Sequence, residues 1–395
     1  MTLPHSVKDR YWLHITLFLL TLATTTWSGA EMAGRFLLYE AASPWFSVGS
    51  ILVSAPFIID GLLFSCSLLL FLTVHEFGHY FAARRHHVST SLPFFIPFPF
   101  NGIGTFGAVI RIRQQIPSMR KLFDIGAAGP LAGFVIALLV LLVGFWTLPG
   151  PEYIESMPGH DNLKEYIVDN GSFPSEIILE NTEEGNITLF IGVTPLYWIL
   201  SQFFSDVPPM WEMYHYPILF AGWLGLFFTA LNLLPVGQLD GGHILYALIG
   251  PKWHSIVARG FVMILLFSGG LGFISEMKPV FYSWDPLLGD LSWVILASML
   301  YFYLHKIFEG NLEWMVPSLL LLVAGIAASS TSSWMVKHIG YSGWLVWSLL
   351  IILLIKVDHP PVAYMEPLTP KRRILAFVGL LIFALCFSIK PLYIG

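Results

Sequence analysis

Long runs of apolar residues, separated by shorter polar segments, follow one another along the whole chain. A run of about 20 apolar residues can cross the ~30 Å hydrocarbon core of a membrane as an α-helix. The pattern predicts an all-α polytopic membrane protein with about eight or nine transmembrane helices, because several later runs are short. The predicted crossings lie near Tyr11–Gly29, Val53–Val74, Ile125–Leu148, Pro217–Leu234, Ile256–Ile274, Leu291–Tyr303, Val316–Ser329, Trp344–Ile355 and Ile374–Phe387.

The composition agrees with a membrane protein. Only 11% of residues are charged, whereas 56% are hydrophobic and 15% aromatic; soluble proteins carry about 25% charged residues. This excludes a soluble chain, and it excludes intrinsic disorder because so much apolar surface has to be buried. The net charge of −5 gives no support for nucleic-acid binding. The two cysteines, Cys66 and Cys386, lie in apolar runs and are expected to be small buried hydrophobes.

Basic residues are unequally divided between the two sides of the predicted topology. With nine crossings, fifteen of the twenty Lys and Arg residues fall on one side, and membrane proteins concentrate such residues in the cytoplasm. We therefore expect an integral protein of a bacterial plasma membrane with its amino terminus in the cytoplasm. The fifteen are Lys8, Arg10, Arg84, Arg85, Arg111, Arg113, Arg120, Lys121, Lys252, Arg259, Lys306, Lys356, Lys371, Arg372 and Arg373.

One long polar stretch, residues 151–214, separates the third and fourth crossings. It holds eleven acidic residues and a single basic one, Lys164. This charge predicts a position outside the cytoplasm. With few strand-like residues beyond Ile187–Val193, the stretch is expected to form a small cap or a partly ordered loop rather than a full domain.

The second apolar run ends in His75-Glu76-Phe77-Gly78-His79. Side chains at i and i+4 lie on one face of a helix, so the two histidines can offer two imidazoles to one metal ion. Glu76 beside them can act as the base for a water that zinc acidifies. Because ionisable residues at membrane depth are typical of functional sites, we predict a zinc site here, close to the cytoplasmic side.

A catalytic zinc ion usually takes three protein ligands, and Asp124 and Asp240 are the candidates for the third. Asp124 is expected near the start of a crossing, where the helix dipole alone explains a carboxylate. Asp240 follows Pro235 and Gly237, which break an apolar helix, and broken helices in membranes occur at cavities or sites. The predicted topology brings Asp240 to the depth of the two histidines, so Asp240 is favoured.

These motifs together resemble the site-2 protease family of intramembrane zinc metalloproteases. The resemblance rests on HEFGH at 75–79 and NLLPVGQLDGG at 232–242, and it covers roughly Phe71–Gly250. It implies the branch that lacks PDZ and CBS domains, because no predicted loop has room for either. It also implies one zinc ion per chain. The roles that the resemblance assigns are zinc ligand for His75, His79 and Asp240, catalytic base for Glu76, and polar stabiliser of the scissile carbonyl for Asn232.

Residues 91–113, after the predicted zinc helix, are apolar but contain three prolines, which forbid a regular helix. We expect a re-entrant loop followed by a short β element near Phe106–Ile112. A free strand edge close to the zinc could capture an unwound substrate by β-addition, which makes Phe106 and Gly107 candidate substrate-binding residues. The alternative is a cytoplasmic turn with a hydrophobic plug.

The predicted function is hydrolysis of a peptide bond in or near the transmembrane segment of another membrane protein, by a zinc metalloendopeptidase. The expected partners are that substrate and the lipid bilayer, and the oligomeric state stays open. The expected regions are an amino-terminal anchor helix with an interfacial segment (1–48), a catalytic membrane core (49–250) and additional transmembrane helices (251–395). The alternative is a membrane transporter or metal-handling protein that uses the same His and Asp residues as an ion site.

Overall fold

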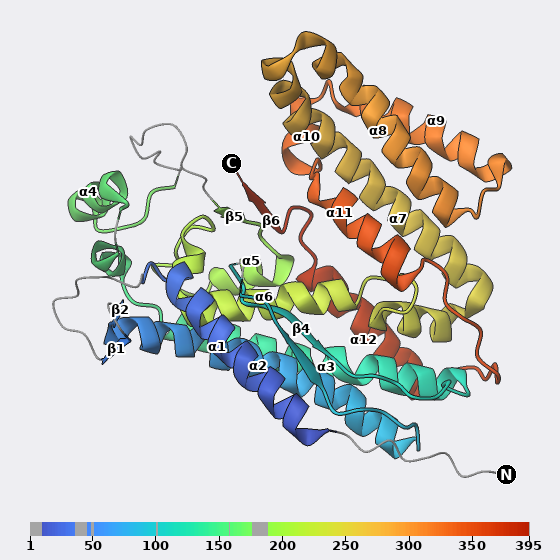
Figure 1. Ribbon diagram of the computed structural model, residues 1–395, viewed down its shortest axis with the longest axis horizontal. Helices are drawn as coiled ribbons and strands as arrows, with labels where there is room; N and C mark the ends of the chain where they lie inside the picture. The colour runs from blue at the N-terminus through green and yellow to red at the C-terminus, as the bar shows by residue number, and fades with distance from the viewer. Residues whose placement is uncertain are drawn as a thin grey trace.

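The computed structural model describes residues 10–35, 46–48, 51–99, 102–157, 159–175 and 189–394 of a mostly helical chain. One bundle of helices occupies the lower half of Figure 1, and α7 leads from it to a second group above. The bundle consists of α1 (Tyr11–Met32), α2 (Ala55–Arg85), α3 (Met119–Trp146), α6 (Pro217–Asn232) and α12 (Pro370–Cys386). The second group consists of α8 (Pro286–Ile307), α9 (Leu312–Ser329), α10 (Ser333–His338) and α11 (Gly343–Leu350), which continues into a π-helix at Ile351–Ile355.

Five helices in the described part of the chain are long and apolar enough to cross a membrane, namely α2, α3, α7, α8 and α9. Two further apolar helices, α6 and the stretch Gly343–Ile355, are shorter. The chain is therefore an integral membrane protein. The total of eight or nine crossings stays a prediction, as does the division into three regions. Residues 1–9 and 36–45 of the first region, and 49–50 at the start of the second, lie outside the described residues.

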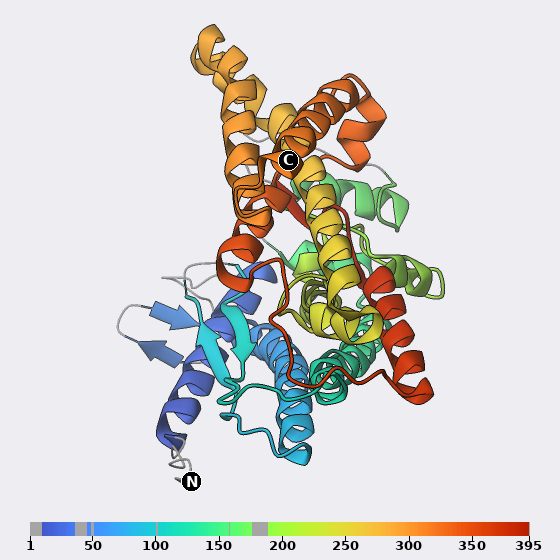
Figure 2. The same cartoon turned by 90° about the vertical axis from the view of Figure 1, so that its right-hand side faces the viewer.

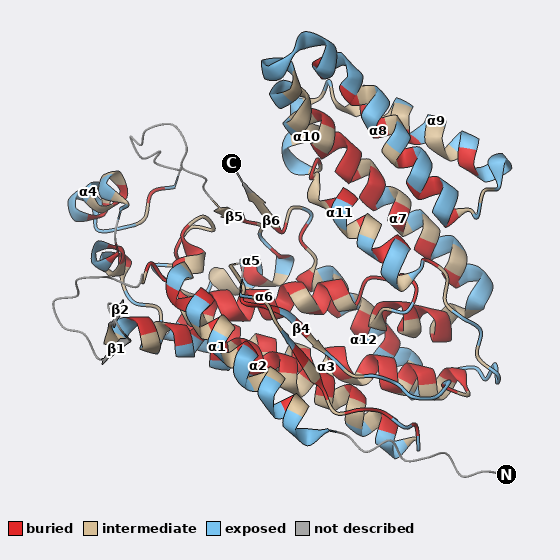
Figure 3. Cartoon of the chain, in the orientation of Figure 1, coloured by how far each residue is buried: buried red, intermediate tan, exposed pale blue. Residues whose placement is uncertain are grey.

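The helices differ in how much of their apolar surface the protein itself covers. Buried residues concentrate in α2, α3 and α6, whereas α8 and α9 are largely exposed (Figure 3). Only 17% of the apolar stretch of α9 is buried, compared with 44% in α2 and in α3. Side chains such as Trp314, Leu320 and Leu321 therefore face outward, and an apolar face of this length is typical of contact with lipid.

Two breaks shape the region after α6. The helix ends at Asn232, and α7 (Asp240–Trp284) begins only after a turn, as the proline and glycines of this segment predicted. Gly237 in the turn has a φ of +54°, and its N–H donates to the carbonyl of Val357 at 3.0 Å. A second kink at Gly250, with a φ of +80°, divides α7 into a short arm that starts at Asp240 and a long arm that carries the predicted crossing.

Helices α2 and α3 pack closely through small residues. A Cβ atom on Gly78 would lie 2.7 Å from the carbonyl oxygen of Ala128, so the two backbones are in direct contact there. The spacing of Gly129 and Gly133 predicts such a close approach. The structure confirms that this stretch packs against the helix that carries the HEFGH motif.

Short β elements complete the fold, so the all-α expectation is incomplete. β3 (Phe94–Pro97) and β4 (Thr105–Val109) form an antiparallel hairpin, with Phe94 opposite Val109. The predicted β element is therefore present, and it has a partner strand that the sequence did not reveal. Figure 2 shows the hairpin beside α1. The other two-stranded sheets pair β1 (Phe46–Val48) with β2 (Ile51–Val53) and β5 (Leu189–Ile191) with β6 (Leu392–Ile394).

The polar stretch forms a set of short elements, as expected, and we call residues 151–215 the cap. It contains η1 (Pro151–Ser156), α4 (Asp161–Asn170), α5 (Pro195–Ser201) and η2 (Met213–His215), with β5 between α4 and α5, whereas residues 176–188 lie outside the described residues. Arg35 holds the cap against the bundle: its side chain pairs with Asp60 at 2.8 Å and donates to the carbonyl of Ser156 at 3.2 Å.

The two cysteines differ from the expectation in one respect. Cys386 is buried, as expected, but Cys66 lies on an exposed face of α2. An apolar run in a membrane helix has a lipid-facing side as well as a packed side, and Cys66 is on the former.

Candidate metal centre

His75, His79 and Asp240 meet inside the bundle, although the sequence separates the aspartate from the histidines by 160 residues. The two Nε2 atoms are 3.1 Å apart. Asp240 Oδ2 lies 3.4 Å from the Nε2 of His75 and 3.2 Å from that of His79. Both histidines are buried, and the first residue of α7 supplies the carboxylate.

These separations fit a metal ion. Zinc with tetrahedral ligands at about 2.0–2.1 Å places neighbouring donor atoms about 3.3 Å apart, and the three distances here are 3.1, 3.2 and 3.4 Å. Two imidazole nitrogens and one carboxylate oxygen are also a common donor set for zinc. We call His75, His79 and Asp240 the membrane cluster.

The orientation of His79 favours the same interpretation. Its Nδ1 lies 2.7 Å from the carbonyl oxygen of Ile125, which can only accept, so Nδ1 carries the hydrogen. The Nε2 atom is therefore the nitrogen turned toward His75 and Asp240. A backbone carbonyl on the far nitrogen is typical of metal-bound histidine.

Glycines of α3 make room for these rings. A Cβ atom on Gly129 would lie 2.1 Å from His79 Nε2, and one on Gly133 would lie 3.0 Å from His75 Nδ1. The small residues between the two motifs therefore do more than let helices approach: they leave the space in which the histidine side chains meet the aspartate.

Glu76 and Asn232 lie beside the membrane cluster. The Glu76 side chain is buried, and its carboxyl lies close to the backbone of Ile110, just past β4. Asn232, the last residue of α6, has its amide nitrogen 3.4 Å from His75 Nε2. The structure thus brings together the five residues that the resemblance names.

Asp124 has a different role from the one considered for it. It lies in the second turn of α3 rather than at its start, so the helix dipole does not explain it. Both its oxygens bind Arg372 at 2.7 Å, and one also lies 2.9 Å from His86 Nε2. Asp124 therefore connects α12 to the ends of α2 and α3, away from the three ligands.

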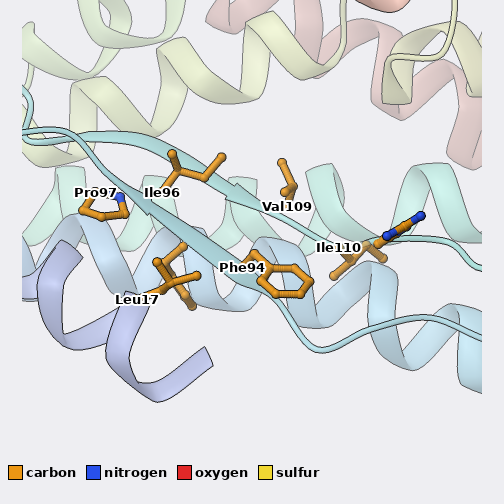
Figure 4. A pocket seen from close by; sticks show the side chains of 8 residues that line it. Leu17, Phe94, Ile96, Pro97, Val109 and Ile110 are labelled. Atoms are coloured by element: carbon orange, nitrogen blue, oxygen red, sulfur yellow. The ribbon is translucent and has the colours of Figure 1, made fainter. Parts of the chain in front are cut away.

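The hairpin borders an open apolar groove of about 530 Å³. Figure 4 shows Leu17 of α1, Phe94 and Ile96 of β3 and Val109 and Ile110 around it. Ile110 lines the groove, and its backbone lies close to the Glu76 carboxyl, so one end of the groove is near Glu76.

The two residues predicted to bind substrate lie farther along β4. Phe106 is 64% exposed, and nothing lies within 4 Å of a Cβ atom built on Gly107. This part of the strand is open to a second chain, but its role in binding stays a prediction.

Three more histidines lie near this end of the bundle. His243 Nδ1 and His359 Nε2 are 2.7 Å apart, and the ring of Tyr246 stacks on His359 with centroids separated by 4.2 Å. His254 is buried nearby. His243, three residues after Asp240, therefore packs against the linker before α12 rather than joining the ligands.

Comparison with known proteins gives the family. Residues 63–271, which are 209 of the 395, match the family described as Peptidase family M50. The chain is 32% identical over 195 residues to "Probable zinc metalloprotease EGY1, chloroplastic" of Oryza sativa subsp. japonica, covering 49% of this chain and 29% of that protein. It is 29% identical over 215 residues to "Probable zinc metalloprotease EGY2, chloroplastic" of Oryza sativa subsp. indica, covering 54% and 33%.

A third relative, the EGY2 protein of Arabidopsis thaliana, is 29% identical over 196 residues, covering 49% of this chain and 30% of that protein. The chain thus spans about a third of the length of the curated relatives it matches. No solved structure matches. The family match covers more than half of the chain and includes the whole membrane cluster. The chain therefore belongs to Peptidase family M50, the site-2 protease family whose motifs it carries.

Proposed function

We propose that this chain is an intramembrane zinc metalloendopeptidase that cleaves a peptide bond in or near the transmembrane segment of another membrane protein, as in regulated intramembrane proteolysis. The observation that carries the proposal is the membrane cluster with the buried Glu76 carboxyl beside it, in a member of a peptidase family.

His75, His79 and Asp240 would hold one zinc ion, in keeping with their donor types and mutual distances. When bound, zinc supplies Lewis acidity and makes water at the site more acidic. Glu76 takes a proton from the attacking water and passes it to the leaving amine. The amide of Asn232 points into the same space and donates a hydrogen bond to the oxygen of the scissile carbonyl.

The groove beside the hairpin is an argument for an extended, apolar substrate. A transmembrane helix has every carbonyl bonded within itself, so it must unwind before hydrolysis. The free edge of β4 would hold the unwound stretch by β-addition, with Phe106 and Gly107 on that edge, and the groove would receive alternate side chains. Lipid and a membrane-protein substrate are thus the partners that the proposal requires.

We also propose that the chain lies in a bacterial plasma membrane with the amino terminus and the active site on the cytoplasmic side. The support is the distribution of Lys and Arg in the sequence. Arg111, Arg113, Arg120 and Arg372 all belong to segments at the membrane-cluster end of α2 and α3, opposite the acidic cap. The names of the relatives place those proteins in chloroplasts.

Membership in a peptidase family favours hydrolysis over ion transport by the same residues. Substitution of Glu76 distinguishes the two functions experimentally. We would compare the wild type with Glu76→Gln on a panel of tagged single-span membrane proteins and measure zinc per chain in both. A protease loses cleavage by at least about 100-fold, the contribution of a general base, and keeps its zinc.

Glu366→Gln is the matched control, because the Glu366 side chain is 48% exposed and pairs only loosely with Arg120 at 3.6 Å. It should leave cleavage and zinc unchanged. Cleavage that persists in Glu76→Gln at the wild-type rate would overturn the proposed mechanism. Zinc flux without cleavage would favour the transporter.

A further inference from the structure

A second cluster of two histidines and a carboxylate lies in the cap. His160 precedes α4, Glu212 precedes η2, and His215 is the last residue of η2. The Nε2 atoms of the two histidines are 3.2 Å apart, and Glu212 Oε2 lies 3.4 Å from the first and 3.5 Å from the second. We call these residues the cap cluster.

The cap cluster has the same dimensions as the membrane cluster. All three of its distances lie close to the separation of about 3.3 Å expected between neighbouring tetrahedral ligands. The imidazole rings are arranged alike too: their centroids are 4.9 Å apart at 82° in the cap cluster, and 4.8 Å apart at 74° in the membrane cluster. Glu212 and His215 are buried, with 6% and 5% of their surface exposed.

The hydrogen bonding of His215 also matches that of His79. Its Nδ1 lies 2.7 Å from the carbonyl oxygen of Met32, so Nδ1 carries the hydrogen. Its Nε2 is therefore the nitrogen turned toward the other two residues of the cluster. A carbonyl that fixes the far nitrogen of a ligand histidine is the usual arrangement in metal sites.

The backbone conformation of His160 is unusual and directs its side chain into the cluster. It adopts a left-handed conformation, with φ +61°, which is uncommon for a residue other than glycine. It stands at the N-cap position of α4, yet its side chain does not cap the helix. Instead, the ring points to Glu212 and His215.

We propose that His160, Glu212 and His215 bind a second divalent metal ion of the zinc class. Two imidazoles and one carboxylate favour zinc and related first-row ions over magnesium or calcium, which prefer all-oxygen sites. The ion connects the start of α4 to η2 and, through His215 and Met32, to the end of α1. It thereby fastens the cap to the bundle and raises the metal content from one to two ions per chain.

The experiment counts metal in the purified full chain, without an affinity tag, after removal of loosely bound ions on a desalting column. Elemental analysis should give about two zinc ions per wild-type chain. The double variant His75→Ala/His79→Ala should retain one, held in the cap. His160→Ala should also retain one, held in the membrane cluster. The combination of all three substitutions should retain none.

His338→Ala is the control for non-specific binding to surface histidines, because this residue lies exposed on α10, with its ring against that of Trp334. It should keep two ions. One ion in the wild type that disappears in His75→Ala/His79→Ala would overturn the proposal. So would a metal content in His160→Ala equal to that of the wild type.

A second measurement needs no substitution in the cap, so a folding defect there cannot obscure the result. Cobalt loaded into His75→Ala/His79→Ala should show the intense visible absorption of tetrahedral Co²⁺, and zinc should displace it. Zinc should also raise the thermal midpoint of this variant in detergent, because an ion that binds only the folded chain stabilises it. Absence of both the absorption and the shift in midpoint would overturn the proposal.

Discussion

The membrane cluster and the cap cluster use the same donor types at nearly the same distances, but they lie in different surroundings. The membrane cluster is formed by α2 and the first residue of α7, with a buried carboxyl from Glu76 and an amide from Asn232 next to it. The cap cluster lies among aromatic rings, with that of Tyr214 only 4.1 Å from that of His215. A metal-ligand geometry therefore does not define an activity: neighbouring groups that can move a proton or hold a carbonyl define it.

The two clusters also differ in the backbone features that position their histidine rings. Glycines of α3 leave room for the rings of His75 and His79, whereas the cap cluster depends on a strained backbone at His160. Metal content, stability and pH dependence can each test whether the two clusters behave as separate units. The following predictions run from the largest expected effect to the smallest.

Gly129→Ala should empty the membrane cluster alone. The added methyl carbon would lie 2.1 Å from His79 Nε2, a distance that forces the ring away from Asp240. We expect zinc affinity at this cluster to fall by at least about 10-fold, as when residues that orient metal ligands are changed, and cleavage to fall with it. The ion proposed for the cap should remain, and elemental analysis together with the cleavage assay measures both.

Gly260→Ala is the matched control, since nothing lies within 4 Å of a Cβ atom at this helical position in α7. It should keep all metal and stabilise the helix by about 0.5–1 kcal/mol. Wild-type zinc affinity in Gly129→Ala would show that His79 does not bind metal in the orientation described above.

Asp124→Asn should reduce stability and leave the metal content unchanged. The substitution weakens two charge-assisted bonds to Arg372 and one contact with His86. Since these side chains are partly exposed, we expect a loss of about 1–2 kcal/mol, seen as a lower thermal midpoint in detergent. Glu366→Gln, at an exposed pair, should cost less than about 0.5 kcal/mol. Loss of a zinc ion in Asp124→Asn would make Asp124 a ligand after all.

Substitution of His359 should have the smallest effect, because His359 belongs to neither cluster. Burial lowers its pKa below the ordinary value, so the folded chain keeps the ring neutral while the unfolded chain takes up a proton. The resulting stabilisation is present above about pH 6.5 and is lost as the pH falls below it. The slope for one proton cannot exceed about 1.4 kcal/mol per pH unit.

The thermal midpoint of the wild type should therefore drop more between about pH 7.5 and about pH 5.5 than that of His359→Gln, which cannot titrate there. The groups that face His359 are His243, Tyr246 and His254. These remain in both proteins, but His243 and His254 are coupled to His359, so the difference between the two pH profiles reports on His359 together with this coupling. Identical profiles would contradict the prediction.

Sequence reasoning locates the membrane cluster because its parts are local. The spacing of His75 and His79 reflects one turn of a helix, and Pro235 with Gly237 interrupts the helix before Asp240. Such reasoning does not find the cap cluster, because His160 and His215 are 55 residues apart, in a stretch without periodicity. The only local signal is the i,i+3 spacing of Glu212 and His215, which many surface helices share.

The fold, like the two clusters, can be predicted from the sequence only where a local pattern specifies it. The apolar runs indicate the helices, and the prolines of residues 91–113 exclude a helix there. The pairing of β5 with β6 and the bond between Asp124 and Arg372 are long-range choices of packing. Hydrophobic periodicity carries no information about them, since each depends on a partner that no local pattern specifies.

The pairing of β5 with β6 has a consequence for the order of events during synthesis. Gly192 donates its N–H to the carbonyl of Pro391, and Ile191 lies opposite Leu392, 201 residues later. At about 5–20 residues per second, a ribosome needs about 10–40 s to make the stretch between them. The donors of the cap cluster, by contrast, are complete once His215 has been made. A metal ion bound there would close the cap on the nascent chain well before its last strand arrives.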